Sequence, residues 1–174
     1  MIPCLLYRKF LVLWLVLVLL AAVPASGSPP VGVRDIVLGM KGADLLRVLA
    51  ANGVYSCAAL TCRQTLLVKD VPVDGFFILA GGTGGMADAK LWEIRLSFDE
   101  HRFPLLREAL VEKYGSPSRS ARISFRLGDG KSKVRETVLW YLGGGEISIT
   151  NISTDGGAGK GGIVMSSGSA GKGF

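Results

Sequence analysis

The chain has little of the chemistry that metal sites and hydrolases use. Of its 174 residues, one is histidine, His101, and three are cysteine. A structural zinc site takes about four ligands, mainly from cysteine and histidine, so we expect no metal and no metal cofactor. No serine lies in the GxSxG pattern of a nucleophile elbow. Gly159-Lys160 is followed by glycine, not by the hydroxyl of a phosphate-binding loop, so we expect no nucleotide cofactor.

Long apolar runs are also scarce, and the clearest one lies at the N-terminus. Arg8 and Lys9 precede the unbroken apolar run Phe10–Val23, and small residues follow it in 25–28. A charged start, an apolar run and a small-residue exit are the layout of a secretory signal peptide. The run is shorter than the roughly 20 residues that span a bilayer. The sequence therefore predicts a signal peptide over 1–28, a periplasmic or secreted mature chain and no stable transmembrane span after cleavage. An uncleaved N-terminal anchor is the alternative.

The net charge is positive but modest. The chain has 20 Lys and Arg against 14 Asp and Glu, and loss of Arg8 and Lys9 with the signal peptide leaves 18 against 14, a charge of +4. Such a surplus favours anionic partners weakly and does not indicate nucleic acid. We expect no nucleic-acid partner.

Two cysteines remain after cleavage, because Cys4 lies within the signal peptide. An even pair in an exported chain favours a disulfide between Cys57 and Cys62. Free or redox-active thiols and a metal site are the alternatives.

Two helices and several strands follow from the periodicity of apolar residues. Helical spacing predicts helices over 43–52 and 103–114, the second begun by Pro104 and closed by Gly115. Alternation over 91–98 predicts a half-buried strand with Trp92, Ile94, Leu96 and Phe98 on the buried face. Further strands are expected over 31–38, 65–71, 76–80, 121–127, 134–142 and 146–152. We expect a turn over 72–75, an irregular crossover around the cysteines and a last edge strand over 163–166.

Helices separated by runs of strands indicate the α+β class. The expected fold is two helices packed on one face of a mainly antiparallel sheet, with two helix-plus-hairpin units as candidate repeats. We assign residues 29–167 to one α+β domain and residues 168–174 to a disordered tail.

Two short patterns carry a resemblance to known proteins. Leu38-Gly39-Met40 stands before a helix that ends in Asn52-Gly53, and Lys113-Tyr114-Gly115-x-Pro117 ends the second helix. In these the chain resembles small exported proteins of Gram-negative bacteria, mostly of unknown function, and distantly BamE-like and β-lactamase-inhibitor-like domains. The resemblance implies helices on one antiparallel sheet. BamE-like lipoproteins carry a cysteine after the signal, and none stands in 25–28 here.

Two clusters are candidates for a functional site. Asp99-Glu100-His101 could do acid–base chemistry, because a carboxylate can orient an imidazole that titrates near neutrality; a solvated turn explains the same residues. A basic set is either a solvated sheet face or an anion-binding surface: Arg122, Arg126, Lys131, Lys133 and Arg135. The leading hypothesis is a periplasmic or secreted binding or envelope-associated protein whose partner is an envelope protein or an anionic lipid or polysaccharide. An exported hydrolase built around His101 and an inhibitor or immunity protein are the alternatives.

Overall fold

One large antiparallel sheet organises the chain. The computed structural model describes residues 29–126, 130–152 and 159–168, so the predicted signal peptide and residues 169–174 of the predicted tail lie outside the described residues. A two-stranded hairpin, β1 (Gly32–Val33) with β2 (Ile36–Val37), precedes the sheet. The predicted single strand over 31–38 is thus wrong, because the chain turns at Arg34 and Asp35.

Each half of the sheet is a helix followed by four consecutive strands. The first half contains α2 (Gly42–Ala51), β3 (Ser56–Ala58), β4 (Thr61–Val68), β5 (Val71–Ala80) and β6 (Lys90–Asp99). A short 3₁₀ turn, η1 (Glu100–Arg102), leads into the second half, which contains α3 (Phe103–Tyr114), β7 (Arg119–Arg126), β8 (Ser132–Leu142), β9 (Gly145–Thr150) and β10 (Lys160–Ser166). The strand order is β3-β4-β5-β6-β10-β9-β8-β7, and every pair is antiparallel. The predicted α+β class with a mainly antiparallel sheet is confirmed.

The two halves meet at β6 and β10 in the middle of the sheet. Ile163 of β10 lies opposite Leu96 of β6, and Ile163 also lies opposite Ile149 of β9. The prediction of an edge strand over 163–166 is therefore wrong. Ile163 and Met165 are each 2% exposed, because a strand between two others buries its apolar residues on the covered face of the sheet.

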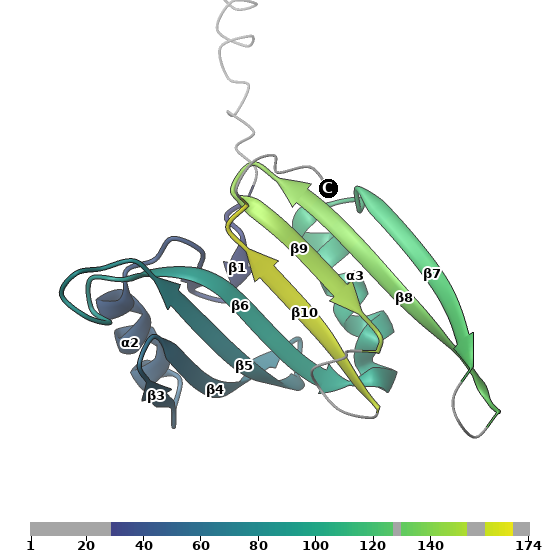
Figure 1. Cartoon of the computed structure of the whole chain (residues 1–174), viewed down its shortest axis with the longest axis horizontal. Coiled ribbons are helices and arrows are strands. Elements are labelled where there is room, and N and C mark those ends of the chain that lie inside the picture. Colours follow the sequence, from purple (N-terminus) through teal and green to yellow (C-terminus); the bar gives the residue numbers. More distant parts are fainter. Residues whose placement is uncertain (1–28, 127–129, 153–158, 169–174) are drawn as a thin grey trace, which may run out of the picture.

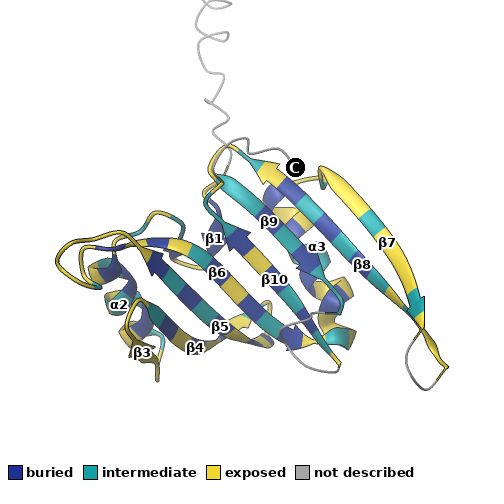
Figure 2. Cartoon of the chain, viewed as in Figure 1, coloured by how far each residue is buried: buried dark blue, intermediate teal, exposed yellow. Residues whose placement is uncertain are grey.

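Apolar residues alternate along the strands and mark the covered face. Ile94, Leu96 and Phe98 are buried on β6, and the residues between them are more exposed (Figure 2). Figure 1 shows α2 and α3 behind the sheet in that view, with the other face of the sheet toward the reader. Leu45 and Leu49 of α2 and Leu106 and Leu110 of α3 join the same core cluster. The face toward the reader is called the open face below.

Trp92 departs from the predicted pattern of β6. Glu93 lies opposite Ile78, whereas Leu91 lies opposite Leu79, so the register shifts and Trp92 is the extra residue of a bulge. A bulge reverses the alternation on one side of it, and Leu91 is buried in place of Trp92, which is 46% exposed. The placement of Trp92 on the buried face is wrong.

Candidate functional site

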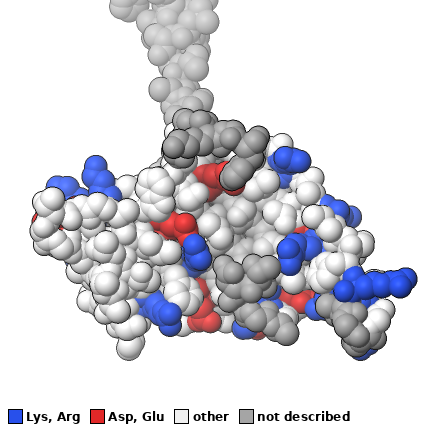
Figure 3. Space-filling model, in the orientation of Figure 1, with Lys and Arg blue, Asp and Glu red and all other residues white. Residues whose placement is uncertain are grey.

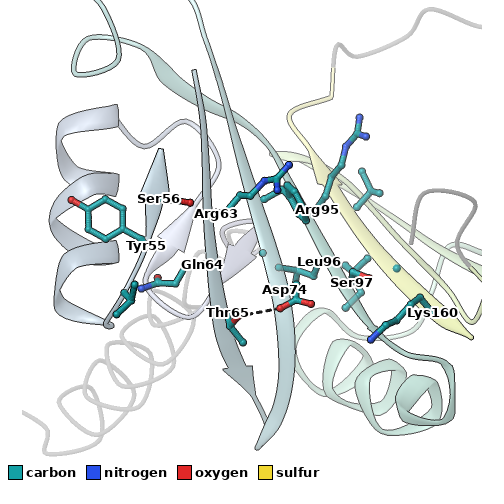
Figure 4. Close-up of a pocket in the computed structure, with 16 residues that line it drawn as sticks. Tyr55, Ser56, Arg63, Gln64, Thr65, Asp74, Arg95, Leu96, Ser97 and Lys160 are labelled. Atoms are coloured by element: carbon teal, nitrogen blue, oxygen red, sulfur yellow. Dashed lines mark hydrogen bonds between the residues drawn. The ribbon is translucent and has the colours of Figure 1, made fainter. Parts of the chain in front are cut away.

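A groove crosses the open face of the sheet. It has a volume of about 830 Å³ and is lined from β3, β4, β5, β6 and β10 and from the loop before β3. Figure 4 shows Tyr55 and Ser56 on one side of it and Lys160 on the other. Such an open, concave surface, which extends from the β3 edge to the middle of the sheet, is where a ligand could contact several strands at once.

Two rows of side chains run across the strands in this groove. In one row Arg63 of β4 lies opposite Phe76 of β5, and Phe76 lies opposite Arg95 of β6. The neighbouring row contains Thr65, Asp74 and Ser97 in the same order of strands, followed by Gly162 of β10, which has no side chain. Each row results from the two-residue period of a strand, which puts every second residue on one face.

The first row combines positive charge with an aromatic ring. The Arg63 guanidinium lies 4.5 Å from the centre of the Phe76 ring, within the range of a cation–π contact. Arg95 forms an ion pair with Glu93 on the same strand. Figure 4 shows the side chains of Arg63 and Arg95 extending to the same side. Both guanidinium groups can donate charge-assisted hydrogen bonds to an anion.

The second row supplies hydroxyl groups and a carboxylate. The Thr65 hydroxyl donates a hydrogen bond of 3.0 Å to Oδ1 of Asp74 (Figure 4). A carboxylate accepts several hydrogen bonds, and a serine hydroxyl such as that of Ser97 both donates and accepts. This row can therefore bind ligand hydroxyl groups.

The predicted Asp99-Glu100-His101 cluster lies where β6 ends. Lys160 Nζ lies 2.6 Å from Oδ1 of Asp99, and this hydrogen bond and the charge of Lys160 lower the pKa of the Asp99 carboxyl. Lys133 Nζ lies 3.1 Å from Oε2 of Glu100. Both carboxylates are thus bonded to lysines, and His101 is exposed. Within the described residues, no group of three or more histidine, cysteine or acidic residues is placed to hold a metal ion.

The β7–β8 register divides the predicted basic set between two faces. Arg122 lies opposite Glu136, whereas Arg135 and Lys133 lie opposite Ile123 and Phe125. Since residues alternate along a strand, Arg122 and Arg126 are on one face and Lys133 and Arg135 on the other; Lys131 lies in the turn.

The contacts of these residues differ with the face. The Arg122 guanidinium lies 2.8 Å from Glu136, which also bonds to Arg107 of α3 at 3.1 Å. On the other face, Arg135 stacks 5.6 Å from the centre of the Phe125 ring. The five cations therefore do not form one continuous patch, and anion binding by them stays a prediction.

Cys57 and Cys62 lie directly opposite each other on β3 and β4. Their sulfur atoms are 2.04 Å apart, the separation of a disulfide. The expected irregular crossover in this segment is wrong, because the chain makes a short hairpin there. The pair fixes β3 beside the groove wall formed by Tyr55 and Ser56.

Sequence reasoning missed the groove residues Arg63, Phe76, Asp74 and Arg95. Alternation in the sequence could have placed Phe76 and Asp74 on one face of β5. It does not show which residues of other strands lie opposite them, because cross-strand register depends on the turns that join the strands.

Comparison of the chain with protein-family models, with curated proteins and with solved structures found no match. Neither helix described by the structure has the length and apolar character needed to cross a bilayer.

Proposed function

We propose that the chain is a periplasmic or secreted binding protein that holds an anionic polysaccharide on the open face of its sheet. The observation that carries the proposal is the groove across β4, β5, β6 and β10, lined by the two rows of side chains. The lining supplies charged groups and hydroxyl groups, which bind ligands, and His101 is not among its residues. An inhibitor or immunity protein would use a binding surface of the same kind.

The charge of the groove favours an anionic ligand. Its lining contains the cations Arg63, Arg95 and Lys160 and one acid, Asp74, a difference of three minus one, or +2. Arg95 and Lys160 also bond to Glu93 and Asp99 outside the lining. A carboxylate or sulfate of the ligand would add charge-assisted hydrogen bonds from Arg63.

The hydroxyl row favours a sugar over a simple polyanion. Asp74 would repel a ligand that offers only negative charge, but it accepts hydrogen bonds from sugar hydroxyls. Thr65 and Ser97 add hydroxyl groups beside it, and the groove runs across strands as a chain-like ligand requires. An acidic polysaccharide offers both kinds of group in each sugar unit.

We also propose that the two halves of the sheet are repeats of one unit, with both helices packed on the same face. The supporting observation is the shared order of one helix and four strands, with the last strands, β6 and β10, meeting in the middle. In such an arrangement the open face is continuous across both units.

Binding of polygalacturonate, followed by calorimetry over a salt series, tests the proposal. We expect Arg63→Glu to weaken binding by about fivefold or more, because it removes one exposed ion pair and adds repulsion. Arg47→Glu is the matched control, since Arg47 lies on α2 with its side chain 79% exposed. Equal losses in both variants would contradict a site in the groove.

Asp74→Asn separates a sugar ligand from a simple polyanion. It should weaken binding of polygalacturonate, since one of the two acceptor oxygens becomes a donating amide group, and strengthen binding of poly-glutamate, since a repelling charge is lost. Tighter polygalacturonate binding by this variant would contradict recognition of sugar hydroxyls. Binding to anionic lipid vesicles but not to polygalacturonate would point to a lipid ligand instead.

A further inference from the structure

The two edges of the sheet are protected to different degrees. At one edge, β3 is three residues long and is linked to β4 by the Cys57–Cys62 pair. At the other edge, β7 is eight residues long and pairs with β8 without a register shift from Arg119 to Arg126. A strand with a partner on one side only presents a row of N–H and C=O groups on the other side. The β7 edge is therefore the long, regular edge at which a further strand could pair.

The outer half of the β7–β8 hairpin also receives little support from the rest of the sheet. Strand β9 pairs with β8 only over Thr137–Leu142, so beyond Glu136 the hairpin continues as two strands, with Asn151 bonding to Glu136 and Val134. Figure 1 shows this end of the hairpin projecting at the lower right, and Figure 2 shows β7 almost wholly exposed. Ile123 is 62% exposed and Val134 is 48% exposed. Two strands alone are marginally stable in water, so a third strand that covered Ile123 would stabilise the hairpin.

The charge of β7 selects among possible third strands. The strand contains Arg119, Arg122 and Arg126 and no acidic residue, and Figure 3 shows basic side chains gathered over this end of the hairpin. A second copy of the chain would set three arginines against three arginines, and like charges on paired strands are destabilising. Arg122 already bonds to Glu136, whereas within the described part of the chain no ion pair engages Arg119 or Arg126. Arg122 and Arg126 lie on one face of β7 and Ile123 on the other, so a strand with acidic residues on one face and apolar residues on the other would complement β7.

We propose that β7 binds an extended acidic segment of a partner protein, which pairs with it as a ninth strand of the sheet. Backbone hydrogen bonds along β7 would hold the segment, apolar residues on one face of the segment would cover Ile123, and carboxylates on its other face would bond to Arg122 and Arg126. This surface is at the far edge of the sheet from the groove, so the proposal is independent of polysaccharide binding. Without a partner, the same arginines keep copies of the chain apart.

A short peptide that alternates glutamate with valine is the probe. We expect it to bind at low salt and to slow hydrogen exchange of β7 amides, because its backbone would take up the unpaired groups of the edge. A peptide of equal charge with proline at alternate positions should bind at least about tenfold more weakly, because proline cannot donate ladder hydrogen bonds. Equal binding of the two peptides would overturn strand addition.

Three variants place the site. Arg126→Glu should weaken binding of the glutamate–valine peptide roughly fivefold, while Arg102→Glu, with the same change in net charge, should leave it within about twofold. Unchanged binding by the first variant would overturn the assignment to β7. Loss of peptide binding in Arg63→Glu would show that the peptide lies in the groove, and this result would also overturn the assignment to β7. Salt-resistant self-association of the wild-type chain through β7 would overturn the proposal of an acidic partner.

Discussion

Leu106 offers the sharpest test of how α3 packs against the sheet. Its side chain is 1% exposed, and it lines a crevice together with Leu96 of β6 and Ile163 of β10. Its neighbour Leu105 is the same residue type in the same turn of the helix but is 38% exposed. Substituting each by alanine changes the same atoms in two different environments.

The expected loss of stability follows from burial. Leucine to alanine removes three carbon atoms, worth about 0.8 kcal/mol each when fully buried, or about 2.4 kcal/mol in all. The cavity left behind adds to this, and buried leucines of this kind lose about 2–5 kcal/mol on substitution. For Leu106→Ala we expect a loss of about 3–4 kcal/mol. For Leu105→Ala we expect about 1 kcal/mol, since less area is buried, no closed cavity forms and alanine favours the helix.

Urea unfolding followed by circular dichroism measures both values. The midpoint for Leu106→Ala should fall well below that for Leu105→Ala, while the slope with urea stays the same for both, because the slope reports the surface exposed on unfolding. Equal midpoints would refute the packing of this face of α3 on the sheet. A larger loss for Leu105→Ala would mean that the buried face of the helix has been assigned wrongly.

Three further predictions concern acid sensitivity, the cysteines and export. Lys160→Met should raise the pKa of the Asp99 carboxyl, which Lys160 lowers in the folded protein, and NMR titration would measure this change. A carboxyl whose pKa is lowered on folding contributes stability above its unfolded pKa, and this contribution is lost as the pH falls through its folded pKa. The variant lacks this contribution, so unfolding experiments at falling pH should show a smaller loss of stability than in the wild type. Thiol labelling of denatured, unreduced protein should modify neither Cys57 nor Cys62, and reduction should cost roughly 2 kcal/mol for so short a loop; labelling of both would contradict the disulfide. Intact-mass analysis of exported protein should find roughly the first 25–28 residues missing, and a chain that still begins at Met1 would contradict cleavage.

The helices and most strands could be predicted because each follows from local periodicity. The stripe of apolar residues in 103–114 and the closing Gly115 give α3 almost to the residue. Trp92 could not be placed in this way. Alternation predicts its burial, but the bulge beside it depends on how β5 pairs with β6, and no signal within 91–98 reports that pairing.

The turn between β4 and β5 was predicted at 72–75 but forms at Lys69 and Asp70. Both residues have positive φ angles, 46° and 62°, in a two-residue turn that usually contains glycine or asparagine. Pro72 and Gly75, the usual turn residues, lie within β5 instead. The usual turn residues therefore predicted the turn at the wrong position, because the pairing of β4 with β5 overrides the local preference of proline and glycine for turns. For the same reason, the sequence alone could not predict which residues line the groove or that the basic residues of β7 and β8 lie on two different faces.

The position of β10 has a consequence for the order of folding. Its neighbours in the sheet, β6 and β9, are far apart in the sequence, because β6 ends at Asp99 and β9 begins at Gly145. Strand β10 follows both of them in the chain. Until residues 160–166 have been synthesised and have left the ribosome, the two half-sheets lack the strand that joins them, and the long-range pairing of β6 is incomplete. Completion of the sheet thus waits for β10, so the two half-sheets stay unjoined for nearly the whole time of synthesis of the chain.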